Sequence, residues 1–181
     1  MSTGRDALLR AAATHFSAAG YAAANVRAIL SDAGVTAPVL YHHFGNKAGL
    51  YVAVATAAHE DVLARFEQAA APGSDPVARV EAVIVAVGQL RRDHPHVVTF
   101  LGAIEQDVAR HPELAELHVV RKRLTDFWDA LFVGGRRDAG RVLAVRSLVE
   151  GFLRVGDSTL EDAQLTATAK ALRAVVRSGL S

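Results

Sequence analysis

The stretch Asn25–Lys47, NVRAILSDAGVTAPVLYHHFGNK, indicates two short helices joined by a tight turn. Asn25 stands where a side-chain oxygen can cap a helix start, and Gly34 stands where a helix end favours a positive φ. Between them, apolar residues recur at helical spacing: Val26, Ile29, Leu30 and Ala33. Thr36 can cap a second helix, whose first turn tolerates Pro38. The pattern predicts a helix-turn-helix whose second helix presents its start and outer face to a partner.

A longer part of the sequence resembles the N-terminal domain of the TetR family of bacterial transcriptional regulators. The resemblance rests on LLRAAATHFSAAGY (8–21), NVRAIL (25–30) and AGVTAPVLYHHFGNKAGL (33–50), which together span about the first quarter of the chain. Two positions depart from the family pattern. Leu30 stands where an alanine usually follows the isoleucine, and Asn25 replaces the more usual threonine.

Length and composition fit a small head joined to a larger body. The chain has 181 residues, of which 51% are apolar, so it can form a packed core. The absence of cysteine excludes disulfides and thiolate chemistry. No apolar run reaches membrane-spanning length, and the N-terminus lacks the features of a signal peptide. We therefore expect a soluble, cytoplasmic protein with no membrane partner. The net charge of +1 does not by itself indicate a nucleic-acid binder.

The remaining periodic segments also have helical spacing, so the sequence predicts an all-α fold of about nine helices. We expect a three-helix helix-turn-helix domain at 1–50, followed by a helical bundle at 51–181. The resemblance implies that this bundle binds a ligand and dimerises. The first helix is expected at about 5–18, and the last two at about 137–155 and 160–176.

The resemblance implies which residues contact DNA. It assigns base-facing positions to Thr36, Ala37, Pro38 and Val39, and contacts with the DNA backbone to Tyr41 and His43. Three of the four base-facing side chains are apolar and suit thymine methyl groups. We therefore expect Arg27 to supply polar readout or a phosphate contact, although it can also be an ordinary solvated residue. Asn25 can hydrogen-bond a phosphate, Tyr41 can instead pack on the helix pair, and His42 can face either DNA or the first helix.

Lys47 is a candidate phosphate contact on physical grounds. It lies in the first turn of the expected fourth helix, where the helix dipole mildly disfavours a cation. A phosphate docked at this helix start would make the lysine favourable. The alternative is a solvated lysine, which costs only a few tenths of a kcal/mol.

The last two expected helices carry broad apolar faces: Val142, Leu143, Val145, Leu148, Val149, Phe152, Leu165, Leu172, Val175 and Val176. Such faces suit a four-helix bundle shared by two subunits, so we expect a homodimer through helices eight and nine. The alternative is a hairpin buried within one subunit.

A small-molecule site is expected where polar residues interrupt apolar stripes of the sixth and seventh helices. The candidate residues are Phe100, Gln106, His118, Arg121 and Trp128. Arg121 would suit an acidic or phosphorylated effector. Alternatively, Arg121 extends to solvent and His118 is an ordinary surface residue.

Other kinds of site find little support. His94, His96 and His111 lack cysteine partners or a carboxylate at a fixed ligand spacing, so we expect no structural zinc and no cofactor. No nucleophile–base set, phosphate loop or carboxylate pair indicates an enzyme. The favoured hypothesis is a ligand-responsive repressor that binds an inverted-repeat operator as a homodimer. The alternatives are an activator on the same fold, or a helical ligand carrier or scaffold that no longer binds DNA.

Overall fold

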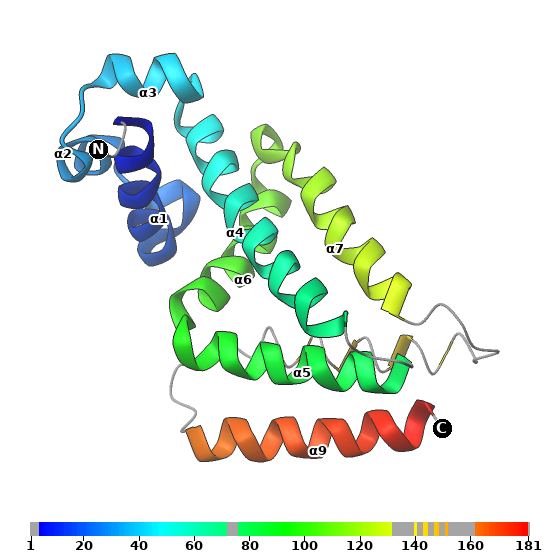
Figure 1. Cartoon of the computed structure of the whole chain (residues 1–181). Coiled ribbons are helices and arrows are strands. Elements are labelled where there is room, and N and C mark those ends of the chain that lie inside the picture. Colours follow the sequence, from blue (N-terminus) through cyan, green and yellow to red (C-terminus); the bar gives the residue numbers. More distant parts are fainter. Residues whose placement is uncertain are drawn as a thin grey trace. The chain divides into compact units, whose positions relative to one another are not determined.

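The computed structural model describes residues 4–71, 76–131, 140, 143–144, 147–148, 151 and 162–180. These residues form α-helices and one short 3-10 turn, without a β-strand among them (Figure 1). The elements are α1 (Gly4–Ala23), α2 (Val26–Ala33), α3 (Ala37–Phe44), α4 (Lys47–Ala70), α5 (Pro76–Asp93), α6 (Pro95–Arg110), η1 (Pro112–Leu114), α7 (Leu117–Leu131) and α9 (Asp162–Leu180). The all-α prediction is confirmed for this part of the chain.

Three boundaries differ from the sequence prediction. α1 bends at Gly20 (φ 71°, ψ 179°) and resumes for one turn to Ala23, because glycine tolerates this conformation. The apolar spacing of the sequence also predicts Leu114 as part of the seventh helix, but Leu114 lies in η1, since the proline after His111 starts a short 3-10 turn. α9 runs to 180 instead of 176. The helix expected at 137–155 falls largely outside the described residues, and its described residues are helical.

The chain divides into two compact units. Unit 1 consists of residues 1–60 and 99–121, and unit 2 consists of residues 61–98 and 122–181. Unit 1 therefore contains the expected helix-turn-helix domain together with parts of α4, α6 and α7. The predicted domain boundary at residue 50 stays a prediction. In the described part of the chain, no helix combines the length and apolar character that a membrane span requires.

The core of unit 1 is built around α1. Leu8, Ala12 and Phe16 recur every four residues along α1, and all three are fully buried. Ile29 of α2 and Leu40 of α3 pack into the same cluster, so three short helices share one apolar interior. Buried residues of α4, α6, η1 and α7 complete it: Leu50, Tyr51, Val54, Ala55, Phe100, Ile104, Val108, Leu114 and Leu117. The helix-turn-helix is thereby fixed to a larger helical base.

Unit 2 is held by the packing of α9 on α5. α5 buries Val80, Val83, Ile84, Val87 and Leu90, and α9 buries Leu172 and Val176. At the edge of this pair, the Arg177 guanidinium donates two hydrogen bonds of 3.0 Å to the Glu81 carboxylate. Trp128 is buried in the same unit and contacts the rings of Phe66 and Phe127.

Candidate nucleic-acid interface

The turn between α2 and α3 is set by its caps. The Asn25 side chain accepts a 2.9 Å hydrogen bond from the Arg27 backbone N–H, which confirms the predicted cap of α2. Gly34 ends α2 in the left-handed region at φ 64°, also as predicted. Its N–H bonds to the Ser31 carbonyl and that of Val35 to the Leu30 carbonyl, each at 3.1 Å, a pairing that stops the helix sharply. Thr36 has the extended backbone of a cap, but its side chain makes no capping hydrogen bond.

The outer face of α3 is open to solvent. Leu40 is buried and holds the helix on the core, whereas Tyr41 is 64% exposed and does not pack its ring away. The other predicted contact residues between 36 and 43 are exposed except for Val39, which is half-buried: Thr36, Ala37, Pro38, Val39, His42 and His43. We call Arg27, Thr36, Ala37, Pro38, Val39 and Tyr41 the recognition edge. Its side chains present methyl groups, hydroxyls and one guanidinium, which suit thymine methyls, phosphates and guanine or phosphate oxygens respectively.

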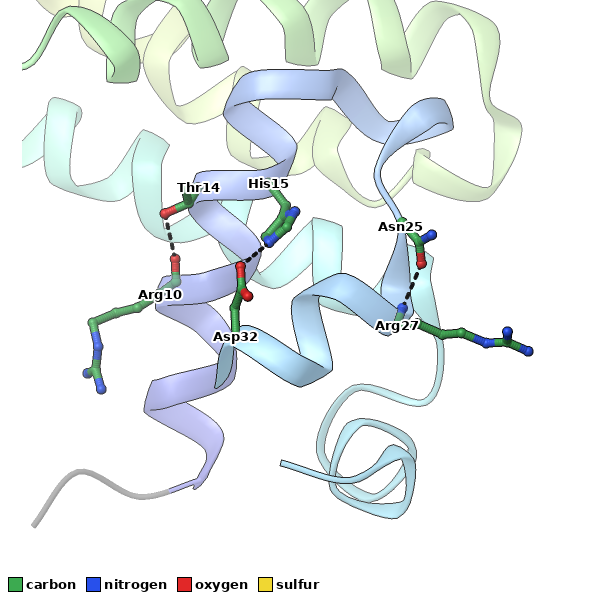
Figure 2. Close-up of polar contacts among 6 residues, drawn as sticks. All are labelled: Arg10, Thr14, His15, Asn25, Arg27 and Asp32. Carbon is green, nitrogen blue, oxygen red and sulfur yellow. Dashed lines mark hydrogen bonds and ion pairs between the residues drawn. The ribbon is translucent and has the colours of Figure 1, made fainter. Parts of the chain in front are cut away.

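Arg27 is exposed at the start of α2 (Figure 2). Its backbone N–H is used in the cap by Asn25, while its guanidinium extends away from the helices. The side chain of Asn25 is therefore engaged within the chain, and its predicted phosphate contact would have to share the capping oxygen or use the amide nitrogen. His42 and His43 place their rings edge-on, with 4.8 Å between the centroids.

The angle between α3 and α4 depends on a close backbone approach that the sequence prediction missed. Asn46 accepts a 2.9 Å hydrogen bond from the Gly49 N–H, so Asn46 caps α4. A Cβ atom on Gly49 would lie only 2.0 Å from the Phe44 carbonyl oxygen. Only glycine allows the backbone to come this close. The close approach in turn sets the angle between α3 and α4. The signal in the sequence was a glycine within a helix that has no turn to explain it.

Lys47 lies in the first turn of α4, as predicted, but its ammonium group has partners within the chain. It donates a 3.0 Å hydrogen bond to the Ala22 carbonyl and lies 5.0 Å from the centroid of the Tyr21 ring. Burial lowers the pKa of Lys47, and the nearby Asp107 carboxylate partly opposes that effect. The Ala22 carbonyl oxygen, near the end of α1, thus accepts a hydrogen bond from the ammonium group for which the sequence predicted a phosphate partner. The phosphate contact itself stays a prediction.

Two further contacts in the head were missed by the sequence prediction. His15 of α1 and Asp32 of α2 form a 2.6 Å ion pair or hydrogen bond that joins these helices (Figure 2). The Arg5 guanidinium lies over the Phe44 ring, 5.6 Å from its centroid, and so links the start of α1 to the end of α3. Both pairs join residues far apart in the sequence, at positions where the local pattern carries no sign of a partner.

Four of the five predicted effector-site residues lie in unit 1, and they differ in exposure. Phe100 is buried in the core of unit 1, with its ring centroid 5.7 Å from that of Tyr51. Gln106 and His118 are exposed, and Trp128 belongs to unit 2. Arg121 is half-buried, and its guanidinium makes two hydrogen bonds to the Glu105 carboxylate, one of them 2.7 Å long. The effector contacts of these residues stay a prediction.

A depression of about 520 Å³ lies over α5 and α9 in unit 2. Its lining consists of Glu81, Lys170, Arg173, Ala174, Arg177 and Ser178, so none of the predicted effector residues contributes to it. His94 and His96 lie close, with 6.1 Å between the ring centroids, whereas His111 belongs to unit 1. Within the described ranges, no three histidine or acidic side chains are grouped as a metal would require.

Comparison with known proteins places the chain in a family. The family model described as "Bacterial regulatory proteins, tetR family" matches residues 8–54, which include the whole recognition edge. The HTH-type transcriptional activator FasR of Mycolicibacterium smegmatis is 31% identical over 137 residues, 75% of this chain and 60% of the activator. The HTH-type transcriptional repressor KstR2 of the same organism is 28% identical over 147 residues, 81% of this chain and 64% of the repressor. This chain therefore spans less than two thirds of the length of either relative.

The fold is found in solved structures as well. The crystal structure of a TetR-like transcriptional regulator from Rhodococcus sp. RHA1 superposes with a TM-score of 0.77 at 20% identity, and the match covers 99% of this chain and 97% of that one. The family model that matches residues 8–54, the two relatives and the solved structure with the same fold all agree with the capped helix-turn-helix formed by α2 and α3. The chain belongs to the TetR family of bacterial transcriptional regulators.

Proposed function

We propose that this protein is a DNA-binding transcriptional regulator that recognises an inverted-repeat operator as a homodimer and responds to a small-molecule effector. The observation that carries the proposal is the recognition edge. It combines an outward-facing guanidinium at the start of α2 with an exposed helix start and tyrosine on α3. A helix of this kind fits the major groove, while the flanking polar groups hold phosphates.

DNA binding is tested by fluorescence anisotropy on a labelled duplex from the region that flanks the protein's own coding sequence, with a duplex of scrambled sequence as the control. We expect tighter binding to the flanking duplex. We also expect log K to fall linearly with log salt, by roughly 0.9 for each phosphate neutralised. Equal affinity for both duplexes at every salt concentration would contradict sequence-specific recognition.

Homodimerisation through helices eight and nine is supported by exposed apolar side chains. Leu143 is 61% exposed, Leu148 is 47% exposed, and Val175 of α9 is 48% exposed. Large apolar side chains exposed to water suit a surface that pairs with a second copy. Analytical ultracentrifugation tests this: Leu148→Asp with Val175→Asp should shift the protein to a monomer, and Val119→Asp, another exposed apolar position at 69%, is the matched control.

We favour repression over activation, since a dimer seated on an inverted repeat within a promoter excludes polymerase. The relatives differ in this respect, because KstR2 is described as a repressor and FasR as an activator. A promoter–reporter assay with and without the protein decides the sign. An effector is then sought as a compound that changes operator affinity, because coupling requires unequal affinity for the two conformations.

The alternative function is a ligand carrier or partner scaffold on the same fold. The retained recognition edge and its caps argue against it, since a carrier would have no use for an exposed apolar helix start. An electrophoretic shift with the flanking duplex discriminates between the two. A carrier would bind an effector yet leave every duplex at its free mobility.

A further inference from the structure

Unit 1 contains a buried carboxylate that the recognition edge does not use. Asp107 of α6 is only 9% exposed. Its Oδ2 atom accepts two hydrogen bonds, one from the Tyr21 backbone N–H at 2.9 Å and one from the Tyr51 hydroxyl at 2.7 Å. These partners lie 86 and 56 residues away in the sequence. A buried carboxylate is costly unless it is well hydrogen-bonded, and bonds to a charged acceptor are shorter and stronger than neutral ones.

The first bond is made at the kink of α1. Gly20 has φ 71°, and the break leaves the Tyr21 N–H outside the regular helical pattern. Asp107 takes up this donor, and a Cβ on Gly20 would lie 3.7 Å from its Oδ2. Beyond the kink the chain makes one more helical turn to Ala23 and then reaches Asn25 and α2. The carboxylate therefore fixes the point from which the recognition edge departs.

The second bond is made on α4. Tyr51 is fully buried, and its ring lies edge-on to Phe16, Tyr21 and Phe100. One turn earlier on α4, Lys47 bonds to the Ala22 carbonyl and covers the Tyr21 ring. We call Asp107, Tyr21, Tyr51 and Lys47 the Asp107 junction. It joins the end of α1, the start of α4 and α6 at one place within unit 1.

We propose that Asp107 is a positioning residue for DNA binding. Through its hydrogen bonds to Tyr21 and Tyr51, this residue of α6 sets the orientation of the recognition edge relative to α6. The inference rests on the proposed function. An apolar side chain at this position could fill the same space, but it would not fix the direction of the Tyr21 N–H. Directional bonds to both α1 and α4 hold the two ends of the helix-turn-helix in one geometry, and a dimer needs that geometry to match two half-sites.

The test compares four proteins: wild type, Asp107→Asn, Asp107→Leu, and the double variant Asp107→Leu with Tyr51→Phe. The probes are a duplex that the wild-type chain selects from a random-sequence pool, and a series of that duplex with the half-site spacer changed by one base pair at a time. Thermal unfolding is followed by circular dichroism, and binding is measured at a temperature at which every variant is folded.

Asp107→Asn keeps one oxygen where Oδ2 accepts both bonds, so it should retain the wild-type spacer preference. Asp107→Leu leaves both the Tyr51 hydroxyl and the Tyr21 N–H without their acceptor, so it should lose stability. It should also bind the selected duplex roughly tenfold more weakly, as expected when a base contact is misplaced. The double variant removes the unsatisfied hydroxyl and should regain part of the stability, because the Tyr21 N–H stays without its acceptor. Its affinity should stay low, and its spacer preference should be broader or shifted.

A merely structural carboxylate would behave differently. If the affinity and spacer preference of the double variant returned together with its stability, the positioning role would be refuted while DNA binding stood. If Asp107→Leu bound with wild-type affinity and spacing, the same conclusion would follow. A wild-type chain that selects no duplex from the pool would refute the proposed function, and the positioning role with it.

Discussion

The recognition edge and the Asp107 junction lie in the same unit and are built in opposite ways. The recognition edge consists of exposed side chains supported by local caps, such as the Asn25 oxygen on the Arg27 N–H. The junction consists of buried groups from α1, α4 and α6 that bond over separations of 56 and 86 residues. Changes at the edge should alter binding and leave stability intact. Changes at the supports of the head should alter stability first, and binding as a consequence.

The largest effect should come from Gly49→Ala, a change in the support of the edge. The new Cβ would meet the Phe44 carbonyl oxygen at 2.0 Å, so α3 and α4 must move apart. We expect a loss of stability of more than about 3 kcal/mol, measured by urea unfolding, together with loss of duplex binding.

The control for this change is Gly102→Ala in α6, where a new Cβ would meet nothing within 4 Å. Removing a glycine from a helix interior there should stabilise the protein by roughly 0.5–1 kcal/mol. If both substitutions stabilised the protein, the close approach would not constrain the corner between α3 and α4.

Arg27→Ala should show the opposite behaviour, with reduced binding and unchanged stability. The capping bond uses the backbone N–H of Arg27, so removing the exposed side chain leaves α2 intact. We expect the affinity for the selected duplex to fall by about 1–3 kcal/mol in anisotropy titrations. Arg65→Ala removes the same charge from an exposed position in unit 2 and should leave binding unchanged. Equal losses in the two variants would reduce the role of Arg27 to net charge.

The same contrast explains what could be predicted from the sequence. The caps at Asn25 and Gly34 act within a few residues, so their chemistry is visible in the local pattern and both predictions are confirmed. Asp107 looks like an ordinary polar residue on α6, and only the folded chain brings the Tyr21 N–H and Tyr51 hydroxyl to it. Arg121 was assigned to an effector by its place on an apolar stripe, yet the structure pairs it with Glu105 from a neighbouring helix. Pairings between residues so far apart in the sequence become visible only in the folded chain.

Lys47→Gln tests to which region this residue belongs. The ammonium bonds to the Ala22 carbonyl and covers the Tyr21 ring, so its removal should cost about 1 kcal/mol of stability in urea unfolding. The predicted phosphate contact of Lys47 implies in addition that the slope of log K against log salt becomes shallower by about 1. An unchanged slope would instead restrict Lys47 to the support of the head.

A pH dependence of stability should arise in the interior of unit 1 and should not involve the recognition edge. His59 of α4 is 6% exposed, and its Nδ1 lies 2.9 Å from the Ala55 carbonyl oxygen. Burial lowers the pKa of His59 below its ordinary value of 6.5, the Ala55 carbonyl and Glu105 partly raise it, and Arg121 lowers it further.

The unfolded chain then binds a proton at His59 more readily than the folded one, so stability falls as the pH drops below 6.5. One such group contributes at most about 1.4 kcal/mol per pH unit. His59→Gln should flatten that part of the stability curve between pH 7 and 5, whereas His118→Gln, at an exposed position, should follow wild type. Duplex binding at pH 7.5 should be the same in all three proteins. If His59→Gln kept the full wild-type slope, the acid sensitivity would have to arise from other groups, and the interior of unit 1 would not respond to pH through this histidine.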